Sequence, residues 1–217
     1  MPVIDHARLA KLEGYHSNNQ RKWEFENRLY QKHLELYLDK MFYYLSGTGA
    51  QTVLDAGCGE GIVYRAMRER GWAGQWTGFD FSAKAVEFAK QASPEAHWRQ
   101  ASIYEIPFPA GSFDLVFSSQ VFEHLPNPQI PLQECARVAE TWLLLSVPLE
   151  PIFRTLTWFS VKLKIGADPG HVNFWTPAAF RRFARGAGRL TTWDWTTIYQ
   201  MALLEVPKVR DSAAGKG

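Results

Sequence analysis

The feature that most constrains this chain is a glycine-rich turn between a short apolar run and a helical pattern. The stretch Val53–Gly61 reads VLDAGCGEG, and the helical pattern begins at once with Ile62. A strand, a glycine-rich turn and a helix in this order build the ligand-binding edge of an open α/β sheet, at the carboxyl ends of its strands. Because glycine lacks Cβ, the backbone can take positive φ and a ligand can lie directly against it. We expect the carboxylate of Asp55, two residues before the first glycine, to face the cationic end of that ligand.

The spacing of the glycines separates two classes of cofactor. Asp55, Gly57, Gly59 and Gly61 form the pattern Asp-x-Gly-x-Gly-x-Gly, which resembles the first motif of the class I S-adenosylmethionine (SAM)-dependent methyltransferases. Dinucleotide-binding folds use Gly-x-Gly-x-x-Gly instead. The resemblance implies a Rossmann-like α/β fold, with a seven-stranded, mostly parallel sheet and helices on both faces. It also implies SAM as the cofactor and S-adenosylhomocysteine (SAH) as the product.

A second acid follows at the end of the next predicted strand. Residues 75–80 form a short strand pattern that ends in Asp80, 19 residues past Gly61. A carboxylate there can accept hydrogen bonds from both ribose hydroxyls of a nucleoside. SAM and NAD both require this, so Asp80 indicates nucleoside binding without choosing between them. The alternative is that Asp80 is only a turn residue before the helix cap Ser82.

Further segments resemble the type-11 methyltransferase group. Ile106–Asp114 reads IPFPAGSFD, which is similar to the Leu-Pro-Phe-Pro…Ser-Phe-Asp segment of that group. Many family members carry an acid that binds the adenine amino group at the position of Ser102, so this chain departs from them there. The resemblance covers roughly residues 50–190. The other cofactor contacts that it implies are Cys58, Phe81, Ser102, Ile103, Ser119 and Gln120.

The segment after the fourth predicted strand lies beside the acceptor in this family. Some quinone-pathway O-methyltransferases bind a divalent metal there through Glu-x-x-Glu-His, whereas this chain reads Gln120-x-x-Glu123-His124. Hard cations need several oxygen ligands, so the loss of one carboxylate predicts no resident metal. His124 is then a general base, a polar wall of the acceptor site, or a structural histidine bonded to a loop carbonyl. His171, in a Gly-His segment similar to one in many family members, is the second candidate for acceptor chemistry.

The chain is expected to form one domain over residues 1–207, followed by a mobile tail at 208–217. A helical stripe at 18–46 is predicted to cover the sheet. Residues 149–175 form an insertion on the acceptor side, much longer than an ordinary connection. The predicted substrate-facing residues are Tyr15, Trp23, His124, Phe153, His171 and Trp175.

The insertion has the composition of a segment that lies at a membrane surface. It holds Phe153, Trp158 and Trp175 beside several basic residues, with no acid between Glu150 and Asp168. One hypothesis is a lid that touches a hydrophobic, lipid-linked substrate at the membrane surface. The other is that these side chains close over the sheet as ordinary core. No run of eighteen apolar residues occurs, so lying on a membrane is the only membrane option.

Composition excludes several other classes. The chain has 217 residues, 46% hydrophobic and 21% charged, with a net charge of +2 and scattered basic residues. This is typical of a soluble globular protein and does not indicate a nucleic-acid surface. Cys58 and Cys135 lack metal-type spacing, so reduced thiols and a cytoplasmic location are expected. No signal-peptide pattern opens the chain.

The predicted activity is methyl transfer from SAM to a small-molecule or lipid-linked acceptor. The reaction is an in-line displacement on a sulfonium that is already activated, so positioning and exclusion of water dominate and a base is needed only for a protonated acceptor. Two alternatives are a nicotinamide-dependent oxidoreductase, against which the glycine spacing argues, and a non-catalytic SAM-binding protein. Cofactor motifs alone do not exclude the second alternative.

Overall fold

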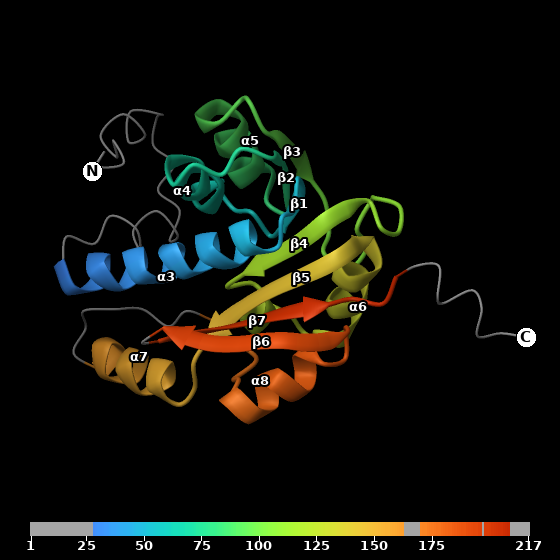
Figure 1. Cartoon of the computed structure of the whole chain (residues 1–217). Coiled ribbons are helices and arrows are strands. Elements are labelled where there is room, and N and C mark those ends of the chain that lie inside the picture. The colour runs from blue at the N-terminus through green and yellow to red at the C-terminus, as the bar shows by residue number, and fades with distance from the viewer. Residues whose placement is uncertain (1–27, 163–169, 197, 209–217) are drawn as a thin grey trace, which may run out of the picture.

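The computed structural model describes residues 28–162, 170–196 and 198–208, and this part of the chain forms an α/β sandwich around one sheet (Figure 1). The predicted sites Tyr15 and Trp23, the first part of the helical cover and most of the C-terminal tail lie outside it. The strands are β1 (Thr52–Ala56), β2 (Gln75–Asp80), β3 (His97–Gln100), β4 (Phe113–Ser119), β5 (Ala139–Pro148), β6 (Arg189–Thr196) and β7 (Tyr199–Glu205). The helices are α3 (Arg28–Gly47), α4 (Ile62–Glu69), α5 (Ala83–Ala92), the 3₁₀ helix η1 (Phe122–His124), α6 (Gln129–Val138), α7 (Ile152–Lys162) and α8 (Pro177–Ala184).

The sheet has seven strands in the order β3-β2-β1-β4-β5-β7-β6. Strands β1 to β5 pair in parallel, and β7 pairs antiparallel with both β5 and β6. The mostly parallel, seven-stranded sheet predicted from the sequence is therefore confirmed. The strand order reverses between β1 and β4, and an open α/β sheet binds its ligand at the carboxyl ends of the strands beside such a switch point.

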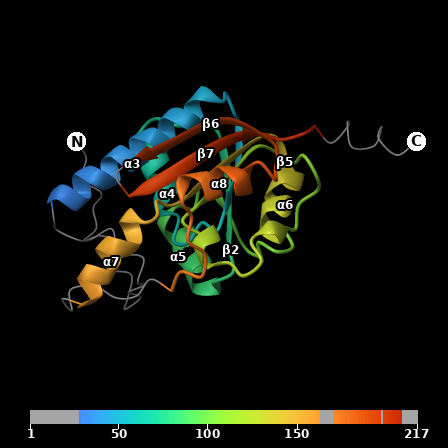
Figure 2. The same ribbon diagram turned by 90° about the horizontal axis from the view of Figure 1, so that it is seen from below.

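Helices cover both faces of the sheet, as predicted. Helices α3, α4 and α5 pack on one face and α6 and α8 on the other (Figures 1 and 2). The strands supply buried side chains to both faces of the sheet. Val53 and Leu144 pack toward α3, α4 and α5, whereas Leu54 and Leu143 pack toward α6 and α8. This explains why the central strands read as continuous apolar runs and not as alternating ones.

Two helices begin directly after residues whose side chains cap them. Ser82 Oγ accepts a hydrogen bond from Ala85 N at 3.3 Å, and Thr176 Oγ1 accepts one from Ala179 N at 3.3 Å. Pro177 occupies the first turn of α8, where its missing N–H costs nothing. Strand β5 is the longest strand of the sheet, because its first residue, Ala139, pairs with Phe113 of β4 and its last, Pro148, pairs with Tyr199 of β7.

The described part of the insertion folds as α7, followed after a gap by an extended segment at 170–176. Helix α7 begins four residues after the end of β5 and therefore stands at the carboxyl edge of the sheet, at the opposite end of the molecule from α6 (Figures 1 and 2). Among the described helices, none combines the length and apolar character needed to cross a bilayer.

Candidate active site

The glycine turn after β1 has a backbone that only glycine adopts easily. Gly57, Gly59 and Gly61 have φ values of 87°, 52° and 70°. A Cβ on Gly57 would lie 2.5 Å from Cγ2 of Val121, and one on Gly61 would lie 2.8 Å from the Trp98 ring. Val121 and Trp98 therefore pack against the turn at Gly57 and Gly61 and leave no room for a side chain at either position. The backbone of the turn lies beside the carboxyl ends of β1 and β4.

Asp80 joins this turn to the start of α5. Its Oδ2 accepts a hydrogen bond from Gly59 N at 3.0 Å, and its Oδ1 accepts one from Ser82 N at 2.9 Å. The turn role considered from the sequence is thus present. Each carboxylate oxygen keeps a second lone pair, so Asp80 can still accept from ribose hydroxyls. The adjacent Phe81 ring is 81% exposed, which leaves its face open to a planar ligand.

Asp55 lies deeper, at the end of β1. Its side chain is only 2% exposed, and within the described part of the chain its Oδ2 has no hydrogen-bond partner. Burial, and secondarily the negative charge of Asp80, raise the pKa of Asp55 to about 8. A cationic group bound beside it would stabilise the ionised form and lower that pKa again.

Asp55 is therefore expected to make the protein less stable as the pH rises. Its folded-state pKa lies above its unfolded-state pKa, so its stabilising contribution is complete below the unfolded pKa and is lost as the pH rises toward and through about 8. This can be measured by urea unfolding between pH 5 and pH 8.5. As the pH rises, the free energy of unfolding of Asp55→Asn should increase relative to that of the wild type, by up to about 1.4 kcal/mol for each pH unit.

Asp114 provides the control for this comparison. Despite partial burial, hydrogen bonds from Gln51 and Thr52 lower the pKa of Asp114, so it stays ionised throughout that pH range. The free energy of unfolding of Asp114→Asn should therefore differ from that of the wild type by a constant amount at every pH in this range. An Asp55→Asn variant that also differed by a constant amount would show that Asp55 is already ionised near neutral pH.

The carboxyl ends of β4 and β5 are tied to α3 by buried hydroxyls. Tyr37 Oη donates to Ser146 Oγ at 2.8 Å and lies 2.6 Å from Ser119 Oγ, which donates to it because Tyr37 has one hydroxyl hydrogen. Gln120, at a positive φ of 57°, donates from Nε2 to the same Ser146 Oγ at 3.1 Å. Burial raises the pKa of Tyr37 to about 12, so it remains a donor. The network fixes two of the predicted cofactor contacts, Ser119 and Gln120.

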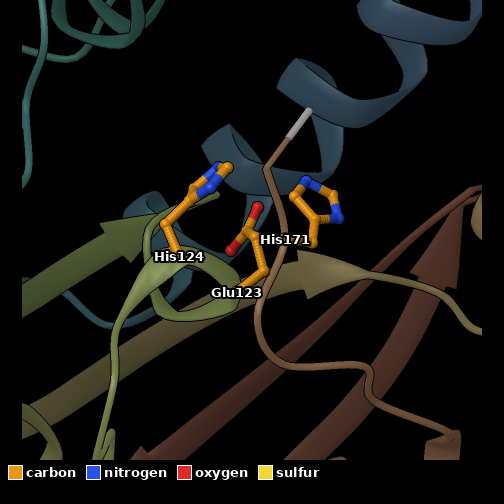
Figure 3. A group of neighbouring side chains, drawn as sticks. All are labelled: Glu123, His124 and His171. Carbon is orange, nitrogen blue, oxygen red and sulfur yellow. The ribbon is translucent and has the colours of Figure 1, made fainter. Parts of the chain in front are cut away.

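Three ligand-type side chains meet directly beyond this network. Glu123 and His124 belong to η1, and His171 comes from the extended segment before α8; Figure 3 shows the carboxylate between the two imidazoles. One nitrogen or oxygen from each of the three lies within 4.8 Å of the others. His124 Nδ1 lies 3.3 Å from Gly170 O, so it has the loop-carbonyl contact considered from the sequence. Phe153 stacks on His171 with ring centroids 5.1 Å apart.

The remaining predicted residues lie in several surroundings. Ser102 is exposed and its Oγ accepts from Tyr104 N at 3.2 Å, while Ile103 is buried. Cys58 is buried, which raises the pKa of its thiol. Trp175 packs against Phe183 of α8, with ring centroids 4.4 Å apart. The structure therefore brings Phe153, but not the Trp175 ring, into contact with the histidines.

Sequence reasoning did not identify several residues that shape this site. Tyr37 and Ser146 were indistinguishable from packing residues, because an apolar stripe or a buried strand does not reveal where a hydroxyl points. Val121 closes the glycine turn, and Gly78 leaves room for the Trp98 ring, since a Cβ there would lie 2.4 Å from it. A glycine inside a strand was the one available signal for such a close approach.

Comparisons with known proteins agree with the fold and the turn. A family model for a methyltransferase domain, of the type-11 group, matches residues 54–141. The ubiquinone biosynthesis O-methyltransferase of Erwinia tasmaniensis is 26% identical over 194 residues, covering 79% of this chain and 78% of that protein. The SAH-bound magnesium protoporphyrin IX methyltransferase of Synechocystis PCC 6803 superposes with a TM-score of 0.67 and 17% identity, over 93% of both chains.

A third comparison shows that a similar fold occurs in a protein named for a different reaction. The [4+2]-cyclase SpnF superposes with a TM-score of 0.64 and 15% identity, over 80% or more of each chain (82% and 84%). The fold thus hosts more than one reaction, and the family match distinguishes among them. It favours methyl transfer over the nicotinamide-dependent alternative. The family model over residues 54–141, the relatives and the sheet topology together support a class I SAM-dependent methyltransferase of the type-11 group.

Proposed function

We propose that this methyltransferase binds SAM at the carboxyl edge of β1 and β2 and transfers its methyl group to an oxygen of an aromatic, lipid-linked acceptor. The observation that carries the proposal is one contact. Val121 lies against Gly57 of the cofactor turn, and Glu123 and His124 lie two and three residues after it. Groups able to accept a proton therefore stand immediately beside the expected position of the cofactor.

The cofactor would be held by groups of complementary chemistry. Asp80 supplies acceptors for the ribose hydroxyls, and the exposed Phe81 ring supplies a face for adenine. Asp55 supplies a buried carboxylate for the methionine ammonium of SAM. The glycine turn allows close approach of the ligand. The other proposed cofactor contacts are Cys58, Ser102, Ile103, Ser119 and Gln120.

The acceptor would react as an oxygen nucleophile. Its oxygen forms a bond to the methyl carbon while the carbon–sulfur bond of SAM breaks, and its proton leaves to His124 or His171. Glu123 would orient the imidazole that takes the proton and stabilise its charged form. The similarity to ubiquinone biosynthesis O-methyltransferases supports an oxygen atom and a lipid-linked ring as the acceptor. The stacking of Phe153 on His171 indicates a surface suited to an aromatic ring.

The test is SAH release from pools of hydroxylated aromatic and quinol acceptors. With a productive acceptor, His124→Ala or His171→Ala should lower kcat by about 10²- to 10⁴-fold while the Kd for SAH stays near the wild-type value. His97→Ala, an exposed histidine of β3, is the matched control. Full turnover by both site variants at every pH would exclude either histidine as the base. SAH binding without turnover on any pool would favour a non-catalytic SAM-binding protein.

Helix α7 carries the proposed membrane contact. Its side chains Ile152, Leu156 and Trp158 are exposed, as are Val172 and Phe174 of the extended segment. These five residues are named here the α7 surface. Basic side chains lie on two of its aromatic rings: Lys162 Nζ is 4.6 Å from the Trp158 ring centre, and the Arg154 guanidinium is 4.9 Å from that of Phe174. Exposed apolar groups with basic neighbours suit an anionic lipid surface.

In flotation with anionic vesicles, the wild type is expected to bind at low salt and Leu156→Glu with Trp158→Glu to stay in solution. Two carboxylates at these exposed positions would oppose insertion into the interface and repel anionic headgroups. Ile130→Glu replaces an equally exposed apolar side chain on α6, outside the α7 surface, and should bind as the wild type does. Equal flotation of all three proteins would contradict the membrane proposal.

A further inference from the structure

We propose that Glu123, His124 and His171 bind a divalent transition cation of the Zn²⁺ type, in preference to Mg²⁺ or Ca²⁺. The sequence predicts no resident metal, because the motif Gln120-x-x-Glu123-His124 lacks one carboxylate. That motif lies within a single segment of the chain. The fold adds a third ligand, His171, from a segment 47 residues beyond His124 (Figure 3).

The donor set determines which cations fit. Two imidazole nitrogens and one carboxylate oxygen are the ligands of catalytic Zn²⁺ sites, and they also suit Fe²⁺, Co²⁺ and Mn²⁺. Mg²⁺ and Ca²⁺ prefer more oxygen ligands than the three side chains supply. The ligand that completes the motif in the quinone-pathway enzymes is absent here. Gln120 donates its amide to Ser146 Oγ at 3.1 Å and so is held by β5.

The spread of the three ligand atoms is close to that of a metal site. They lie within 4.8 Å of one another. Tetrahedral ligands about 2.1 Å from a zinc ion are about 3.4 Å apart, so closure needs a shift of about 1.5 Å at most. Rotation about side-chain bonds can provide a shift of this size without moving the backbone.

The backbone that carries His171 is clamped onto η1. Val172 N and Asn173 N both donate to Glu123 O, at 2.8 and 3.0 Å. The Asn173 amide also donates to Phe122 O at 2.9 Å and Leu125 O at 2.7 Å. These four bonds fix the segment next to η1, so His171 is held beside Glu123 before any ligand binds. Preorganisation of this kind is what a metal site requires of its supporting residues.

A second contact orients His124. Its Nδ1 lies 3.3 Å from Gly170 O. A carbonyl oxygen only accepts, so Nδ1 carries the hydrogen and Nε2 presents a lone pair. A histidine ligand with its other nitrogen bonded to a backbone carbonyl is the usual arrangement in metal sites, because the outer contact fixes the tautomer and the ring direction.

Burial indicates why a cation is favoured and how it enters. Glu123 is 1% exposed, and a buried carboxylate needs a compensating positive charge. Either a proton on a neighbouring imidazole or a bound cation can supply it. His171 is half-buried and His124 is exposed, so the three side chains run from the interior to the surface and leave a path for an ion.

The consequence for catalysis rests on the proposed function. Three protein ligands leave coordination positions open, and an acceptor hydroxyl bound there would lose its proton more readily. Imidazoles that ligate the cation cannot also take that proton, so with the cation bound it would pass to solvent and the cation would replace the histidine base. Binding of the cation itself depends only on the three side chains. The two proposals can therefore fail separately.

The experiment uses the full chain, stripped with a chelator and saturated with SAH. Titration with Zn²⁺, followed by calorimetry and elemental analysis, is expected to give one ion per chain, with binding at least 100-fold tighter than for Mg²⁺. Co²⁺ should give visible absorption bands that depend on both histidines. His124→Ala and His171→Ala should each weaken Zn²⁺ binding at least 10-fold, whereas His97→Ala should leave it unchanged.

A gain-of-ligand variant makes the test sharper. Gln120→Glu restores the missing carboxylate and should narrow the preference for Zn²⁺ over Mg²⁺. The proposal is overturned if stripped wild type binds no more Zn²⁺ than the His124→Ala/His171→Ala double variant. Calorimetric binding of SAH by the same samples shows that each variant is folded. Normal SAH binding and turnover without metal uptake would leave the proposed function intact and assign the three side chains to proton transfer alone.

Discussion

Replacing Asp80 with alanine is expected to weaken SAH binding by about 10- to 100-fold, which corresponds to about 1–3 kcal/mol for lost hydrogen bonds. Two losses combine in this variant. The ribose hydroxyls lose their acceptor, and the N–H groups of Gly59 and Ser82 lose the carboxylate that now holds them at 3.0 and 2.9 Å. Calorimetric titration with SAH measures the effect.

A SAH analogue without the ribose 2′-hydroxyl separates these two losses. The wild type should bind this analogue more weakly than SAH, whereas Asp80→Ala should hardly distinguish the two ligands. Such a cycle, with one change in the protein and one in the ligand, measures the interaction free energy between Asp80 and the ribose hydroxyl separately from the effect of Asp80 on the loop. Asp80→Asn, which keeps one acceptor oxygen, should fall between the two proteins. An unchanged preference for SAH over the analogue in Asp80→Ala would assign Asp80 to the loop alone.

The parts of the fold that could be predicted are those set by local patterns. Strand β2 was bounded correctly because its polar flanks and its final Asp80 interrupt a short apolar run. Helices α5 and α8 begin at their capping residues, since Ser82 and Thr176 satisfy backbone N–H groups that the helix leaves unpaired. The glycine turn was recognisable because positive φ at alternate positions requires a particular residue type.

The parts that could not be predicted depend on contacts between distant segments. His171 reaches Glu123 only because Asn173 and Val172 bond to η1, and no local pattern encodes that register. The hydroxyl of Tyr37 finds Ser146 across 109 positions of the chain, in a helix that reads as an apolar stripe. The motif Gln120-x-x-Glu123-His124 gives no sign of His171, because it contains only residues that are neighbours in sequence.

The closure of the cofactor turn by Val121 leads to the second large effect. Gly57→Ala is expected to lower the free energy of unfolding by about 2–5 kcal/mol. A side chain at φ 87° is strained by about 1–2 kcal/mol, and overpacking adds about 1–3 kcal/mol. The new methyl group would lie 2.5 Å from Val121 Cγ2, so either the turn or the start of η1 must move. SAH affinity should fall with stability, because both segments border the proposed cofactor site.

Two further variants separate strain from steric conflict. Gly71 also has a positive φ, 91°, but no atom would lie within 4 Å of a Cβ there, so Gly71→Ala should show the cost of strain alone. Val121→Ala removes the methyl groups that Gly57→Ala would meet, so the double variant should lose less stability than the sum of the two single variants. Urea unfolding of the four proteins measures both differences. If Gly57→Ala is no worse than Gly71→Ala, or if the two losses simply add, then Val121 does not hold the turn, and the link from the cofactor turn to Glu123 and His124 would have to run through another contact.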